Sequence, residues 1–179
     1  MSATLDLTED QVTETLGNFL AAVLPIAAAN VFVGQENQIP EPTASDFVVM
    51  WPIARSRLGL TDQSWQYVTA PTTMQNQTAT EVTVQVDIHG PSSADNAQLF
   101  ADLWQSDYGC AYYDEVALPM RPLRAEVSGQ VPFINGEGQF ENRWVVKAVL
   151  QANVTVSTTQ DFADTITVDP VNVEAAYPA

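Results

Sequence analysis

The feature that most constrains the fold is a long alternation of side chains between Arg143 and Val156. Every second position in this stretch is apolar, and these positions are Trp144, Val146, Ala148, Leu150, Ala152, Val154 and Val156. A period of two predicts a β-strand with one buried face. At about 3.3 Å per residue, the strand would be on the order of 45 Å long. Because that exceeds the length of an ordinary strand, we expect it to bend or to leave its own domain and meet a neighbouring molecule.

A second alternating segment leads directly into a helical pattern. Apolar and polar residues alternate from residue 82 to residue 89, which predicts a strand with one dry face and one wet or interfacial face. Gly90 and Pro91 end this strand, and Ser92 or Ser93 can cap the helix that follows. The apolar stripe of that helix consists of Ala97, Phe100, Ala101, Trp104 and Tyr108. The segment is therefore a predicted unit of strand, turn and amphipathic helix.

Another helix is predicted between Thr8 and Pro25. Thr8 and Gln11 have the spacing of a capping box, and acidic residues lie in the first turn, where the helix dipole favours anions. The apolar run from Leu16 to Val33 could suggest a signal peptide or a membrane span. Polar residues and a proline interrupt this run, and acidic rather than basic residues precede it. We therefore interpret the run as a buried helix of a soluble protein.

Three further segments complete the predicted elements. Val31 to Val33 is a candidate short strand, and Phe47 to Ile53 is apolar on both faces, which indicates a central or doubly covered strand. Residues 69–80 are nearly uncharged and rich in Thr and Gln. We interpret them as an exposed loop, or as the tip of a long hairpin that follows a strand around Trp65 to Val68. A disordered tether is the alternative, because such polar tracts cannot bury a core.

The composition is acidic, and its charges are unevenly distributed. The chain has 179 residues and a formal net charge of -16, and its length is most simply that of a single domain over residues 1–179. All of its bases lie in the middle of the chain, at Arg55, Arg57, Arg121, Arg124, Arg143 and Lys147. This balance argues against an unassisted nucleic-acid binder. The acids can form a surface that keeps the protein soluble, or an acidic lumen past which DNA slides without binding.

No residue pattern in the sequence indicates an active site. His89 is the single histidine and Cys110 the single cysteine, so an intrachain disulfide is excluded and a structural zinc lacks its usual ligands. Ser92 and Ser93 follow a proline as helix caps, and the G-x-S-x-G turn of a hydrolase is missing. We predict no catalytic residue, no bound metal and no cofactor, and a protein that acts through its surfaces.

Two sets of residues are candidates for contacts with other subunits or with a tube. The first set is the scarce bases, Arg55, Arg57, Arg121, Arg124, Arg143 and Lys147, because each can pair with acids of an adjacent copy. Pairing within the chain or simple solvation is the alternative for these bases. The second set lies in the 69–80 segment and comprises Met74, Gln75, Asn76 and Gln77.

Two ordered strings of residues carry a resemblance to a known family. The first string is Gln85, Asp87, Gly90, Pro91, Asp95, Asn96 and Ala97, and the second is Pro132, Phe133, Asn135, Glu137, Gln139, Glu141, Arg143 and Trp144. With shorter matching segments elsewhere, the chain resembles the phage neck or tail terminator proteins over nearly its whole length. It departs from the family where residues 122–126 are basic and where His89 replaces an aromatic residue. These departures concern the local interface more than the fold.

The resemblance implies a fold, a function and a set of partners. The fold would be α+β, with a mixed and largely antiparallel sheet flanked by two main helices and a long hairpin or loop extension. The protein would be a structural component of the virion, assembled in the host cytoplasm, and not an enzyme. It would form a ring, commonly of six subunits, that caps the head-proximal end of the tail tube and joins it to the head connector.

The implied partners are copies of the chain itself, the tail-tube protein, a head-tail connector or neck protein and, in some tails, the sheath. DNA would pass through the lumen without specific binding, and no membrane is involved. The alternatives are a tail-tube or head-completion subunit and, from a different class of protein, a small-molecule-binding module.

Overall fold

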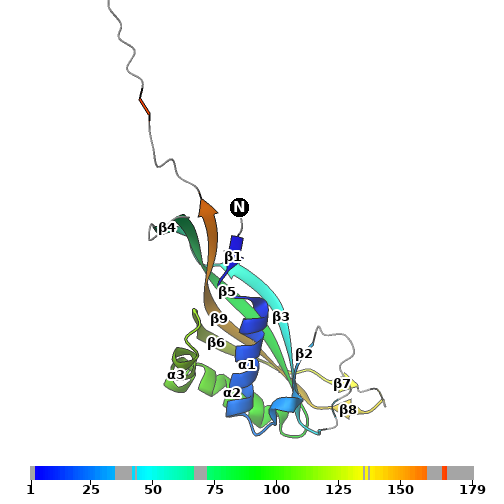
Figure 1. Cartoon of the computed structure of the whole chain (residues 1–179). Helices are drawn as coiled ribbons and strands as arrows, with labels where there is room; N and C mark the ends of the chain where they lie inside the picture. The colour runs from blue at the N-terminus through cyan, green and yellow to red at the C-terminus, as the bar shows by residue number, and fades with distance from the viewer. Residues whose placement is uncertain are drawn as a thin grey trace, which may run out of the picture.

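The protein consists of one large sheet with helices against one of its faces and a small hairpin beside the other (Figure 1). The structure is a computed structural model that describes residues 3–34, 42, 44–66, 72–134, 136, 138–160 and 167–168. The large sheet has seven strands, and all of its strand pairs are antiparallel except the pair of β2 (Val31–Val33) with β3 (Phe47–Arg57). This architecture confirms the α+β fold with a mixed, largely antiparallel sheet.

Two long strands form the centre of the sheet. β5 (Thr72–His89) and β9 (Arg143–Gln160) have 18 residues each and pair without a register shift, from Thr72 opposite Gln160 to His89 opposite Arg143. The prediction of a long strand from Arg143 to Val156 is therefore confirmed, and the strand continues for four residues more. Val82, Val84, Val86 and Ile88 of β5 are buried, as their alternation predicts.

Shorter strands flank the central pair on both sides. At the end of the sheet near the helices, β3 pairs with β5, and β6 (Met120–Gln130) pairs with β9. At the opposite end, β4 (Asp62–Gln66) pairs with β5, and β1 (Ala3–Leu5) pairs with β9. We call this second end, formed by β1, β4, residues 72–77 of β5 and residues 155–160 of β9, the arm. The separate hairpin consists of β7 (Phe133–Ile134) and β8 (Phe140–Glu141).

The predicted caps fix the first helix, α1 (Glu9–Val23). The Thr8 hydroxyl accepts a hydrogen bond from the backbone N–H of Gln11, and the Gln11 side chain accepts one from the backbone N–H of Thr8 at 2.8 Å. The helix ends at Leu24, directly before Pro25, which cannot continue it. A 3-10 turn, η1 (Ala28–Asn30), then leads into β2.

The helical segment after β5 contains two helices, α2 (Ser93–Trp104) and α3 (Asp107–Val116). Ser106 separates them, because its hydroxyl accepts a hydrogen bond from the backbone N–H of Tyr108 and caps a new helix. Ala97, Phe100, Ala101 and Trp104 are buried as predicted. Tyr108 does not continue their stripe: it lies on α3 and is 51% exposed.

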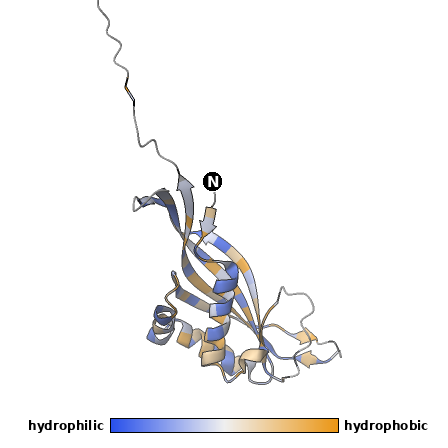
Figure 2. Cartoon of the chain, viewed as in Figure 1, coloured by the Kyte–Doolittle hydropathy of each residue, from blue (hydrophilic) through white to orange (hydrophobic). Residues whose placement is uncertain are grey.

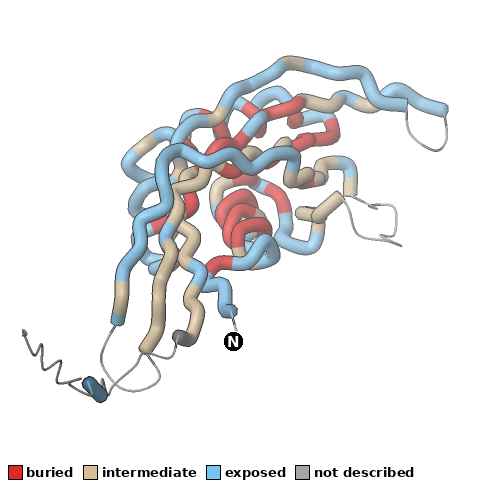
Figure 3. Tube along the Cα trace, turned by 90° about the horizontal axis from the view of Figure 1, so that it is seen from above, coloured by how far each residue is buried: buried red, intermediate tan, exposed pale blue. Residues whose placement is uncertain are grey.

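The core lies between the helices and the inner face of the sheet (Figure 3). Phe19 of α1 lies at its centre, with its ring 5.4 Å from that of Trp104 and 6.0 Å from that of Tyr113. The Trp104 indole N–H donates to the carbonyl of Val149 at 3.3 Å, so its polar atom is satisfied inside the core. These rings join α1, α2 and α3 to one sheet face.

The loop interpretation of residues 69–80 is wrong for residues 72–80, which form a strand. Residues 72–80 belong to β5 and pair with β9 on one side. On the other side, residues 73–77 pair with β4 and Thr80 pairs with β3, whereas residues 67–71 lie outside the described part of the chain. Thr suits a pleated strand because it is β-branched, and pairing on both sides satisfies the backbone of a segment that has few core residues. The hairpin interpretation agrees with the pairing of β4 and β5, although β4 ends at Gln66.

Candidate binding pocket and subunit-contact residues

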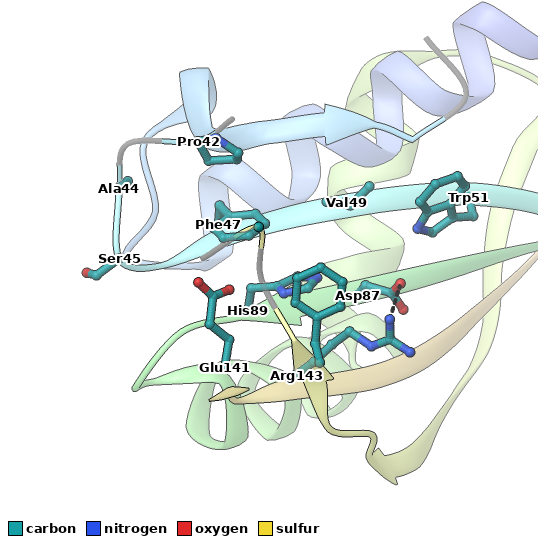
Figure 4. Close-up of a pocket in the computed structure, with 12 residues that line it drawn as sticks. Pro42, Ala44, Ser45, Phe47, Val49, Trp51, Asp87, His89, Glu141 and Arg143 are labelled. Atoms are coloured by element: carbon teal, nitrogen blue, oxygen red, sulfur yellow. Dashed lines mark ion pairs between the residues drawn. The ribbon is translucent and has the colours of Figure 1, made fainter. Parts of the chain in front are cut away.

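A pocket of about 280 Å³ lies on the outer face of the sheet, opposite the helices and next to the β7–β8 hairpin (Figure 4). β3, β5 and β9 supply its floor, and Phe133 and Gly136 of the hairpin region supply a wall. Its lining residues within the described chain are Pro42, Ala44, Ser45, Phe47, Val49, Trp51, Asp87, His89, Phe133, Gly136, Glu141 and Arg143. Segments far apart in the sequence therefore converge at one end of the central strand pair.

Strand register positions the aromatic side chains of the pocket. Phe47, His89 and Arg143 are neighbours across β3, β5 and β9, so their side chains share the outer face. The His89 ring is stacked on that of Phe47, with centroids 4.4 Å apart and planes at 8°. Phe133 meets the His89 ring edge-on, with centroids 5.2 Å apart. His89 is therefore enclosed between two aromatic rings and is only 4% exposed.

A buried carboxylate and a guanidinium lie next to this aromatic group. Asp87 is 4% exposed, and its Oδ2 lies 4.0 Å from Nη1 of Arg143. Gln85 donates a hydrogen bond to Oδ1 of Asp87 at 2.9 Å. The guanidinium carbon of Arg143 also lies 5.9 Å from the centre of the Phe133 ring. Arg143 thus connects the floor of the pocket to its hairpin wall.

Burial determines the protonation state of His89. Removal from water lowers the pKa of His89 below its ordinary value of 6.5, and the positive charge of Arg143 lowers it further. The carboxylates of Asp87 and Glu141 oppose this shift, but desolvation is the largest effect. At neutral pH the imidazole is therefore uncharged.

Three buried polar atoms around the pocket have no hydrogen-bond partner among the described residues. They are Nε1 of Trp51, Nδ1 of His89 and Nε of Arg143. The Trp51 and Arg143 atoms are donors only, whereas the His89 atom can donate or accept. Unpaired buried donors cost stability. All three atoms are shielded from solvent, so this cost falls on the folded protein.

The pocket does not have the arrangement of a catalytic triad. The hydroxyl of Ser45, which is the lining residue with nucleophile chemistry, donates to the Asp46 carboxylate at 3.3 Å. Within the described residues, no group of three or more His, Cys, Asp or Glu side chains could hold a metal ion. The residues described around the pocket can bind a partner group through aromatic contacts and hydrogen bonds.

Four of the candidate contact bases lie next to an acidic residue of the same chain. Arg55 lies 3.5 Å from Glu9, Arg121 pairs with Asp114, and Arg143 faces Asp87. Arg124 makes two hydrogen bonds of 3.1 Å to the carboxylate of Glu81 and a third of 3.1 Å to Glu126, which raise the pKa of Arg124. Arg57 and Lys147 are exposed.

The second candidate set lies along the β5 strand of the arm. Met74 accepts a hydrogen bond from Gln63, Gln75 accepts one from Gln66 at 3.2 Å, and Gln77 is exposed. These residues, with Asn76, form part of a mainly polar surface that the helices do not cover (Figure 2).

Sequence reasoning did not find the pocket. It placed Asp87 and His89 on a wet or interfacial face of their strand, but both side chains are buried, and Phe133 of the hairpin packs against the His89 ring. A signal was present, because the two strings of family-like residues contain Asp87, Phe133, Glu141 and Arg143, which all meet at the pocket. The missing information was the register that brings β3, β5 and β9 together.

The family model described as phage neck terminator protein matches residues 10–174, and the chain therefore belongs to the phage neck terminator family. A comparison with curated proteins returned no match. Membership of this family makes the chain a structural protein of the bacteriophage neck, which confirms the resemblance seen in the sequence. In the described part of the chain, no helix has both the length and the apolar character needed to cross a membrane.

Proposed function

We propose that copies of this protein form a ring that caps the head-proximal end of the phage tail tube and joins it to the head connector. The observation that carries the proposal is the family match, which extends over residues 10–174. In this role the ring stops the addition of further tube subunits and presents a docking face to the head. The ring size implied by the resemblance is six subunits.

The arm supports the proposal because it offers a surface free of helices. Its strands carry mainly Thr, Gln, Asn and Ser side chains in a protein of net charge -16. Such side chains bind other polar surfaces by hydrogen bonds and avoid the repulsion that an acidic patch would meet in a ring of identical copies. We assign the tube contact to Met74, Gln75, Asn76 and Gln77 on this surface. The exposed bases Arg57 and Lys147 are the remaining candidates for contact with acids of a neighbouring subunit.

The alternative within the same class is a tail-tube or head-completion subunit. Such a protein would polymerise into a tube or bind the portal and would not stop growth at one end. The pocket keeps the small-molecule-binding alternative open, but its volume of about 280 Å³ lies at the low end of the range for ligand sites. Thermal stabilisation by a panel of metabolites would support that alternative.

Electron microscopy of particles made with this gene silenced tests the proposal. We expect filled heads that are not joined to tails, beside free tails of irregular length. Tails of normal length with unjoined heads would instead indicate a head-completion protein. Normal joined virions would contradict the proposed function.

A further inference from the structure

The turn between β3 and β4 presents an apolar side chain to solvent. Leu60 is 96% exposed and Leu58 is 49% exposed, on either side of Gly59. The backbone N–H of Leu58 donates to the carbonyl of Ala79 at 2.9 Å, and the hydroxyls of Thr61 and Thr78 lie 2.9 Å apart. Both sides of the turn are therefore fixed to β5, and Leu60 is held in place at little further cost in entropy on binding.

This turn and the pocket lie at opposite ends of one strand. β3 begins at Phe47, which lines the pocket, and ends at Arg57, directly before Leu58. Its 11 residues correspond to a separation of about 35 Å. A head-to-tail contact between identical copies requires two different patches on one subunit, and these two are separated along β3. The exposed apolar residues Ile134 and Phe140 do not meet this condition, since they lie on the hairpin beside the pocket.

The chemistry of the pocket matches the turn. Phe47, Trp51 and Phe133 give it aromatic walls, and its volume of about 280 Å³ suits a side chain better than a large ligand.

The charges at the two sites are also complementary. Among the described lining residues, two carboxylates, Asp87 and Glu141, and one guanidinium, Arg143, give one net negative charge, which disfavours an acidic ligand. The Leu58–Leu60 turn is neutral and follows the exposed base Arg57. An incoming turn can therefore bring Arg57 near the rim carboxylate of Glu141.

We propose that the Leu58–Leu60 turn of one copy docks in the pocket of the next copy, with Leu60 between the aromatic walls. The inference rests on the proposed ring of identical subunits and assigns its lateral contact. Repeated around the ring, each copy gives its turn to one neighbour and its pocket to the other. The contact closes when the rotation between copies divides a full turn evenly.

Disulfide trapping in phage particles tests this contact. In a chain whose exposed Cys110 is replaced by Ser, Leu60→Cys and Ser45→Cys place one thiol on the turn and one at the rim of the pocket. After mild oxidation, particles that carry both changes should give a ladder of covalent multimers on a non-reducing gel. The matched control pairs Leu60→Cys with Gln98→Cys on the exposed face of α2, and it should give no ladder.

A second variant measures the contribution of the leucine itself. Leu60→Asp should reduce the amount of the chain in purified particles at least tenfold, because it brings a carboxylate to a pocket of the same sign. Leu99→Asp makes the same change at a 40% exposed leucine on α2 and should have little effect. Circular dichroism of both purified variants checks that each is folded.

The outcomes separate this inference from the proposed function. Joined particles that contain the chain but give no ladder, or normal incorporation of Leu60→Asp, would overturn the docking contact and leave the terminator role intact. A covalent product between Ser45→Cys and a different neck protein would assign the pocket to that partner and overturn the contact between copies. Joined, normal particles that lack the chain would overturn both.

Discussion

The same two strands form the best-buried and the least-covered parts of the molecule. Between residues 82 and 88 of β5 and residues 146 and 152 of β9, alternate side chains are fully buried under the helices. In the arm, the same strands continue with Thr, Gln, Asn and Ser, and most of their residues are half-buried or exposed. The backbone ladder is equally regular in both parts, with 18 consecutive pairs and no register shift.

The comparison shows that strand formation and core formation are separable in this protein. The helix-covered part is stabilised by apolar burial on one face, whereas the arm depends on backbone pairing and on cross-strand contacts of side chains. Substitutions in the covered part should therefore act on stability. Substitutions in the arm should act on assembly.

The largest effect on stability is expected from Trp104→Ala in the helix-covered part. The change leaves a cavity beside Phe19 in the aromatic core and leaves the carbonyl of Val149 without its indole donor, so the free energy of unfolding should fall by about 3–5 kcal/mol. Trp65→Ala in the arm is the comparison and should cost clearly less, because Trp65 is half-buried whereas Trp104 is fully buried. Urea unfolding curves measure both values. Equal losses would show that the arm belongs to the same core as the helices.

Arg143→Met should have the next largest effect, at the boundary between β9 and the pocket. Asp87 stays buried and keeps its bond from Gln85, but it loses the guanidinium 4.0 Å away, so unfolding should become easier by about 2 kcal/mol. Lys147→Met changes an exposed base on the same face of β9 and should shift stability by less than about 0.5 kcal/mol. Indistinguishable midpoints for the two variants would show that Asp87 does not depend on Arg143.

A smaller effect is expected from the titration of His89. Its pKa lies below 6.5 in the folded protein, so below pH 6.5 the unfolded chain binds more protons than the folded chain. His89 therefore destabilises the fold progressively as the pH drops from 7 toward 5. His89→Gln should remove this part of the pH dependence, which is read as the difference between the two proteins, because the carboxylates titrate in both. Parallel stability profiles over this range would contradict the assignment.

The smallest effect on stability, but a large effect on assembly, is expected in the arm. Gln77→Ala removes an exposed side chain and should change the free energy of unfolding by less than about 0.5 kcal/mol. If Gln77 contacts the tube, the fraction of joined heads and tails should fall in phage that carry the variant. Gln98→Ala on α2 is the exposed control and should leave joining unchanged. Equal fractions of joined heads and tails in the two variants would show that Gln77 is not part of the tube contact.

The main elements could be predicted because their signals are local. The capping box of Thr8 and Gln11, the stop at Pro25 and the alternation in β9 are each visible in a few neighbouring residues. Ser106 shows where local reasoning fails, since a single capping hydroxyl divides the predicted apolar stripe and turns Tyr108 outward. Residues 72–80 show the same limit, because their strand state depends on pairing with β9, which is about 80 positions away in the chain.

The pocket could not be predicted for a related reason. Its floor requires Phe47, His89 and Arg143 to be neighbours across three strands, and this register is set by the complete sheet. The sequence placed Asp87 and His89 on a wet or interfacial strand face, but both are buried, and Phe133 of the β7–β8 hairpin packs against the His89 ring. The burial of His89 therefore depends in part on a segment more than 40 positions further along the chain.

The unbroken pairing of β5 and β9 holds the two ends of the sheet at a fixed distance from each other. A continuous ladder of 18 residue pairs joins the pocket to the tip of the arm, and it spans on the order of 60 Å if it is straight. Side-chain substitutions leave this length unchanged, so they can weaken a contact at either end without moving it. Adding two residues to each strand would keep every side chain on its own face and lengthen the ladder by about 7 Å. The spacing between the two ends is therefore set by the number of paired residues in β5 and β9.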